Sequence, residues 1–144
     1  MSILEPAQIK FLNRMFYDEY AMRVAILEEQ ALQVSNQGRS RTSGHSFTSD
    51  PTATTAIKNL TPISKVKVRG SVYDHPETWL LVMQETWAYY GASMEKEAMF
   101  RRYHNLESPE TTCIWMGIGR TTYFAWREDF LTQAAFFATK RNIF

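Results

Sequence analysis

The sequence has little of several features that would place it in a specialised class of protein. Its 144 residues include one cysteine, Cys113, so no disulfide can form within the chain. Six glycines and five prolines are too few for a collagen-like or low-complexity chain. Uncharged runs within the predicted helices, such as Thr78 to Gln84, are far shorter than the roughly 18–20 apolar residues of a membrane span. The first residues, which include Glu5 and Lys10, lack the apolar segment of a signal peptide. We therefore expect a cytoplasmic protein without membrane contact.

Net charge is also low, at +1, and its distribution along the chain is more informative than its sum. The segment 35–73 contains one acidic residue, Asp50, and most of the basic excess. Its basic residues are Arg39, Arg41, Lys58, Lys65, Lys67 and Arg69. A chain so close to neutral differs from strongly basic nucleic-acid-binding domains, whose pI exceeds about 9. Any binding of DNA must therefore come from a local basic patch or from a dimer.

Aromatic residues, in contrast, make up 14% of the chain and favour a dense helical core. Apolar residues at steps of three and four predict one long amphipathic helix over 6–33. Its apolar stripe can pack within the chain or against a second copy, so a homodimer stays open. Residues 34–50 lack apolar periodicity and are predicted to form a loop. A short helix over 51–60, started by Asp50 and Pro51, follows.

The segment 63–73 alternates Ile63, Val66 and Val68 with Lys65 and Lys67, which is typical of a strand. With no clear second strand in the sequence, we interpret it as an extended basic connector. Further helices are predicted from about 76 to Tyr90, from Met94 to about Asn105, over 109–116 and from Arg120 to about Thr139. The predicted fold class is all-α, with about five helices. The predicted divisions are an N-terminal helix (1–34), a basic linker with a short helix (35–73) and a helical domain (74–144).

The last third of the chain has the spacing of a helix-turn-helix. Ser108 and Pro109 start a short helix, and Gly117 can adopt the positive φ of a tight turn. Cys113 is a small residue suited to a helix crossing. We expect Ile118, Tyr123 and Trp126 to fill the space between the helices, although an αα corner in a helical core would have the same pattern.

In a DNA complex, the N-terminal end of the second helix of this motif enters the major groove. We expect Arg120, Thr121, Phe124 and either Arg127 or Glu128 on its outward face. There Arg120 would pair with guanine, and Phe124 would contact either a thymine methyl or another protein. Thr121 or Thr122 would reach a phosphate or a base edge. Arg101, Arg102, Arg127 and Lys140 would contact the DNA backbone or a polymerase, and Arg39, Arg41, Lys65, Lys67 and Arg69 would form a basic arm along the phosphates.

The run from Thr111 to Arg127, TTCIWMGIGRTTYFAWR, resembles the C-terminal module of phage transcriptional regulators of the RinA and ArpU type. That module is similar to region 4 of bacterial sigma factors. The family has a run like ISRRTVFRWR where this chain has IGRTTYFAWR, and the DPTA at 50–53 resembles a stretch after the family's first helix. Gly119 replaces the usual serine, the segment 61–76 looks like an insertion, and the recognition helix is less basic. The resemblance implies an activator of phage late genes, such as packaging or lysis operons, that binds double-stranded DNA in a bacterial host. It leaves the host RNA polymerase open as a second partner.

Other chemistries have weaker patterns. His45, His75, His104 and Cys113 lack the spacing of metal ligands. Residues 117–122 lack the third glycine of a dinucleotide fingerprint, and no strand precedes them. We therefore expect neither an enzyme nor a cofactor. Two alternatives to a transcriptional regulator stay open, namely a small terminase-like subunit in a ring and a protein-interaction module or polymerase adaptor that does not bind DNA.

Overall fold

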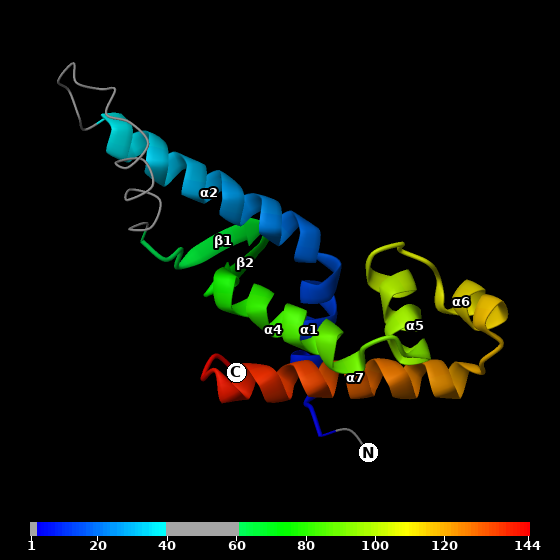
Figure 1. Ribbon diagram of the computed structural model, residues 1–144. Helices are drawn as coiled ribbons and strands as arrows, with labels where there is room; N and C mark the ends of the chain where they lie inside the picture. Colours follow the sequence, from blue (N-terminus) through cyan, green and yellow to red (C-terminus); the bar gives the residue numbers. More distant parts are fainter. Residues whose placement is uncertain (1–2, 40–60) are drawn as a thin grey trace. The chain divides into compact units, whose positions relative to one another are not determined.

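The computed structural model describes residues 3–39 and 61–144, although not the side chains of 36–39. This part of the chain is mostly helical, as predicted, and Figure 1 shows its six helices and one small hairpin. The predicted helix over 51–60, the DPTA at 50–53 and the loop from 40 onwards lie outside the described residues. The elements are α1 (Pro6–Tyr17), α2 (Glu19–Arg39), β1 (Lys65–Val68), β2 (Ser71–Asp74), α4 (Pro76–Tyr90), α5 (Met94–Tyr103), α6 (Pro109–Met116) and α7 (Arg120–Lys140).

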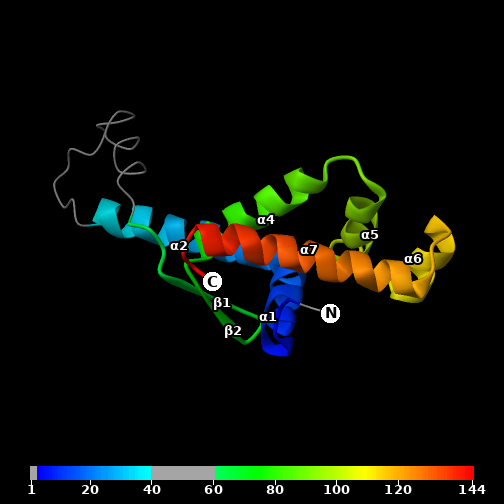
Figure 2. The same cartoon turned by 90° about the horizontal axis from the view of Figure 1, so that it is seen from below.

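The chain folds into two compact units, which differ from the predicted divisions at 34 and 73. The first unit comprises Met1–Glu19 and Thr78–Phe144, and the second comprises Tyr20–Glu77. Helix α1 therefore belongs with the C-terminal helices, because it packs against α7. Figure 2 shows α7 as the long helix of the first unit, with α1 crossing it.

The prediction of one unbroken helix over 6–33 is wrong, because the chain turns at Asp18. The Asp18 N–H donates to the carbonyl oxygens of Arg14 and Met15, both at 3.0 Å, and closes α1 before α2 begins. The periodicity placed Asp18 and Glu19 off the apolar stripe, yet both are buried. Asp18 pairs with Arg14 at 3.8 Å, and Glu19 Oε1 accepts a 2.9 Å hydrogen bond from the Trp87 indole. The partner of Asp18 is therefore local, whereas that of Glu19 is 68 residues distant in sequence.

Aromatic rings form the centre of the first unit, in agreement with the dense core predicted from composition. Phe130 of α7 is fully buried, with its ring centroid 4.8 Å from those of Phe16 and Trp87 and 5.4 Å from that of Tyr90. The Tyr103 ring lies 5.4 Å from Phe16. Because four helices contribute these rings, the cluster joins α1, α4, α5 and α7 around one point.

The second unit contains an antiparallel hairpin where the sequence predicted an unpaired connector. Strand β1 pairs with β2 in a register that sets Lys65 opposite Asp74 and Val66 opposite Tyr73. Arg69 and Gly70 form the turn with φ of 49° and 83°, the positive values that two-residue hairpin turns require. The strands are four residues each, too short for periodicity alone to reveal the second one.

Candidate nucleic-acid interface

Helices α5, α6 and α7 pack on one another in the first unit and include the predicted helix-turn-helix. Helix α6 begins after Ser108, whose Oγ accepts a 3.2 Å hydrogen bond from the Thr111 N–H, with Pro109 in the first turn. Gly117 ends α6 in the left-handed region, at φ 66° and ψ 38°, and α7 starts at Arg120. The structure therefore confirms the three-residue turn and the positive φ predicted for Gly117.

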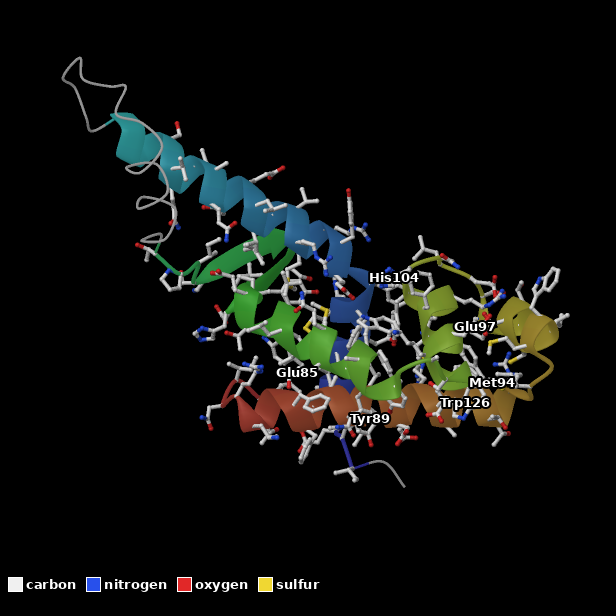
Figure 3. The ribbon with its side chains drawn as sticks, in the orientation of Figure 1. Glu85, Tyr89, Met94, Glu97, His104 and Trp126 are labelled. Atoms are coloured by element: carbon white, nitrogen blue, oxygen red, sulfur yellow. The ribbon has the colours of Figure 1, made fainter. Side chains whose placement is uncertain are left out.

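Small and aromatic side chains fill the crossing between α6 and α7. Cys113 and Tyr123 are buried, as the motif predicts, and Thr112 beside Cys113 is buried as well. Ile118 and Trp126 are half-buried, so they cover this crossing only in part. Figure 3 labels Met94 at the start of α5 and Trp126 in the first half of α7, two helices that pack against each other.

Arg102 was predicted to contact DNA, and the structure overturns that expectation. Arg102 is only 8% exposed, and its Nη1 donates a 3.1 Å hydrogen bond to the Tyr123 hydroxyl. The rings of Tyr17, Tyr103 and Tyr123 surround the guanidinium at 5.6–5.8 Å. Burial by itself disfavours the charged form, but the hydrogen bond to Tyr123 leaves the pKa of Arg102 raised. Arg102 therefore holds α5, α1 and α7 together instead of facing solvent.

Arg101, next to Arg102 on α5, forms ion pairs with two acidic residues. Its guanidinium lies 3.3 Å from the Glu107 carboxylate and 3.4 Å from Glu97, four residues earlier on α5. Glu107 also accepts a 2.7 Å hydrogen bond from the Thr112 hydroxyl, which joins the end of α5 to the first turns of α6. Through Glu107, Arg101 therefore helps to connect α5 to α6.

Arg120, at the start of α7, is exposed as predicted but already has an acidic partner. It forms an ion pair with Glu110 of α6. A backbone hydrogen bond and then this guanidinium lower the pKa of Glu110, so the carboxylate stays ionised at neutral pH. Arg120 also lies 5.3 Å from the Phe124 ring centroid, and Arg127 lies 5.1 Å from it.

The outward face of α7 differs from the predicted one. Phe124 and Arg127 are half-buried, and the Arg127 guanidinium lies over the Phe124 ring. Thr121, Thr122 and Ala125 are the exposed positions of the first two turns, together with Arg120. The surface that α7 presents at its start is therefore small and polar, with one cation.

The other basic residues predicted to bind DNA lie at the far end of α7 and on the hairpin. Lys140 is exposed at the far end of α7, about 27 Å along the helix axis from Thr122 at 1.5 Å per residue. Lys65, Lys67 and Arg69 lie exposed on the hairpin of the second unit, where Lys65 approaches Asp74 at 4.0 Å. Arg41 and the side chain of Arg39 lie outside the described residues.

Two exposed features of the first unit were missed by the sequence analysis. Ile114 and Trp115 of α6 are 80% and 72% exposed. The sequence of this short helix did not indicate which of its residues would be buried and which exposed. Asp129 of α7 accepts a 3.0 Å hydrogen bond from the Tyr90 hydroxyl and lies beside Glu95. Burial first, and then the Asp129 carboxylate, raise the pKa values of both Tyr90 and Glu95. The paired acids could not be found from sequence spacing, because they lie on different helices.

Among the described residues, no three His, Cys, Asp or Glu side chains gather in a metal-binding arrangement. No helix in residues 3–39 or 61–144 is long and apolar enough to cross a membrane. Comparisons of the chain with protein-family models, with curated proteins and with solved structures each gave no match.

Proposed function

We propose that this protein is a sequence-specific DNA-binding regulator whose α7 enters the major groove by its N-terminal end. The observation that carries the proposal is the α6–α7 pair itself, turned at Gly117 so that Arg120, Thr121 and Thr122 are exposed together. The first N–H groups of a helix attract phosphate, and Gly119 leaves those of α7 without a side-chain cap. The residues needed for groove contact are therefore present at one helix end.

Each exposed residue at the start of α7 has a distinct expected role. Arg120 would pair with guanine after exchanging its Glu110 partner for the base, and Thr121 or Thr122 would bind a phosphate or base edge. Phe124 and Arg127 would orient Arg120 by stacking beside it instead of touching DNA themselves. The resemblance to RinA and ArpU regulators supports a role in activating phage late genes in the host cytoplasm.

The test is recovery of fragments of the source genome by the purified full chain at two salt concentrations. We expect one discrete sequence whose binding weakens as salt rises. Arg120→Ala should then cost roughly 1–3 kcal/mol of binding and relax the preference at one base pair. Arg141→Ala is a matched control, because Arg141 is also exposed and also paired with an acid, Glu85, at the other end of α7. Equal binding by all three proteins would refute the assignment of Arg120.

The second candidate is a polymerase adaptor, and the exposed Ile114 and Trp115 of α6 favour it specifically. Exposed aromatic residues of this kind are enriched at the centres of protein interfaces. If the adaptor function is correct, the chain would bind purified RNA polymerase but no DNA at low salt, and Trp115→Ala would abolish that binding. A ring of eight or more chains in solution would instead indicate the terminase-like alternative.

A further inference from the structure

The second half of α7 has an exposed face that the proposed DNA contacts do not use. Asp129, Phe136 and Lys140 are exposed and recur at steps of seven and four, so they lie along one side of the helix. Phe136 is 55% exposed, and Tyr89 of α4 is 61% exposed beside the same helix (Figure 3). The Phe137 ring lies 5.9 Å from Phe136 and 6.1 Å from Tyr89, so the three rings form one surface, here called the aromatic patch.

At one end of this face lies a pair of acids without a basic partner. Asp129 lies close enough to Glu95 to raise the pKa of that carboxyl, and the Tyr90 hydroxyl donates a 3.0 Å hydrogen bond to Asp129. Within residues 3–39 and 61–144, neither acid forms an ion pair. Two adjacent carboxylates of this kind gain from any cation that approaches from outside.

At the other end lies Lys140, whose ammonium has no acidic partner in the described part of the chain. Its Nζ lies 5.6 Å from the Phe136 ring centroid, at the edge of the aromatic patch. Lys140 follows Asp129 by eleven residues, which corresponds to about 16 Å along the helix. The face therefore has an acidic end, an aromatic centre and a basic end.

We propose that this face binds the same face of a second copy of the chain, with the two α7 helices antiparallel. Reversing one copy brings Lys140 of each chain to Asp129 and Glu95 of the other, so both charge pairs form at once. The aromatic patches then meet near the two-fold axis, as in other isologous dimers. A face with opposite charges at its two ends is complementary to itself only in this reversed orientation. The proposal does not depend on DNA binding, because it uses the half of α7 distant from Arg120.

The test is sedimentation equilibrium of the full chain and of two charge reversals. The wild type should sediment as a dimer, at twice the chain mass of 16.8 kDa. In a dimer of Lys140→Glu, the new glutamate of each chain would face Asp129 and Glu95 of the other and repel them. In a dimer of Asp129→Lys, the new lysine of each chain would face Lys140 of the other and repel it. Each variant alone should dissociate at least about tenfold more readily than the wild type. An equimolar mixture should form a heterodimer of near wild-type affinity, because both pairs are then again of opposite charge.

Controls separate loss of the interface from loss of the fold. Phe136→Glu should also give single chains, whereas Trp115→Glu, which changes a still more exposed aromatic residue on α6, should leave the dimer intact. All variants should keep the circular dichroism and the melting temperature expected for folded single chains. A wild type that is a single chain at all concentrations would overturn the proposal. A dimer that neither charge reversal weakens, or two folded variants that fail to associate when mixed, would overturn it equally.

Discussion

The two ends of α7 carry similar residues in opposite situations. At its start, Arg120 is paired with Glu110, and Phe124 and Arg127 are stacked beside it. In its second half, Asp129 and Lys140 have no ion-pair partner among the described residues, and Phe136 is largely exposed. The difference shows that availability for binding depends on what neighbouring helices place beside a charge, and not on the charge alone.

The largest expected difference is in the free energy of unfolding, between a substitution on the buried face of α7 and one on its exposed face. Phe130→Ala removes a fully buried ring from the centre of the first unit, so unfolding should become easier by about 3–5 kcal/mol. Phe136→Ala changes an exposed ring and should alter the free energy of unfolding by about 0.5 kcal/mol or less. Urea denaturation at low protein concentration, where self-association contributes little, measures both. Similar losses of unfolding free energy in Phe130→Ala and Phe136→Ala would contradict the assignment of Phe130 to the buried face of α7 and of Phe136 to its exposed face.

A smaller effect should come from the turn that precedes α7. Gly117→Ala introduces a side chain at φ 66°, which should destabilise the fold by about 1–2 kcal/mol. No atom lies within 4 Å of the added Cβ, so the cost is one of backbone conformation and not of collision. Thermal unfolding followed by circular dichroism measures it.

Gly119, in the same turn, is the matched control. It has φ −84° and equally open surroundings. Gly119→Ser should stabilise α7 by a few tenths of a kcal/mol through its hydroxyl, about the difference between serine and glycine as N-caps. If Gly117→Ala and Gly119→Ser destabilised the fold equally, the positive φ at Gly117 and the negative φ at Gly119 would be contradicted.

The smallest effect tests the ion pair at the start of α7. Glu110→Gln releases Arg120, so DNA affinity should rise a few-fold if Arg120 contacts DNA. Glu97→Gln, which removes one of the two acids paired with Arg101 on α5, should leave affinity unchanged. Fluorescence titration of one labelled operator compares the three proteins. A loss of affinity in Glu110→Gln would mean that Glu110 holds Arg120 in its binding position instead of competing with DNA.

The pH dependence of that effect follows from the lowered pKa of Glu110. A carboxylate with a depressed pKa keeps its contribution to stability above its unfolded pKa and loses it only as the pH falls through its folded pKa. The folded pKa lies below the ordinary 4.5, so the ion pair should persist throughout the neutral range. The ratio of affinities between Glu110→Gln and the wild type should therefore stay constant from about pH 8 to pH 6. A ratio that falls toward one across this range would place the pKa of Glu110 elsewhere.

Much of the helical framework could be predicted from local signals. The start of α6, the end of α4 before Gly91 and the turn at Gly117 depend on a cap or on positive φ values that a few adjacent residues decide. The break at Asp18 could not be predicted, because it depends on burying Asp18 and Glu19 beside partners such as Trp87. The hairpin was missed because each strand is only four residues long.

By itself, the sequence determined where most helices begin and end and that a helix-turn-helix could form near the C-terminus. These features arise from backbone hydrogen bonds and allowed φ values within one or two turns of the chain. Only the tertiary structure decided which charges are available. It buried Arg102 among three tyrosines from different helices, paired Arg120 with Glu110 and gave Lys140 no acidic partner within residues 3–39 and 61–144. Burial and pairing of charge depend on residues far apart in sequence, because the chain must first fold to bring them within hydrogen-bonding distance.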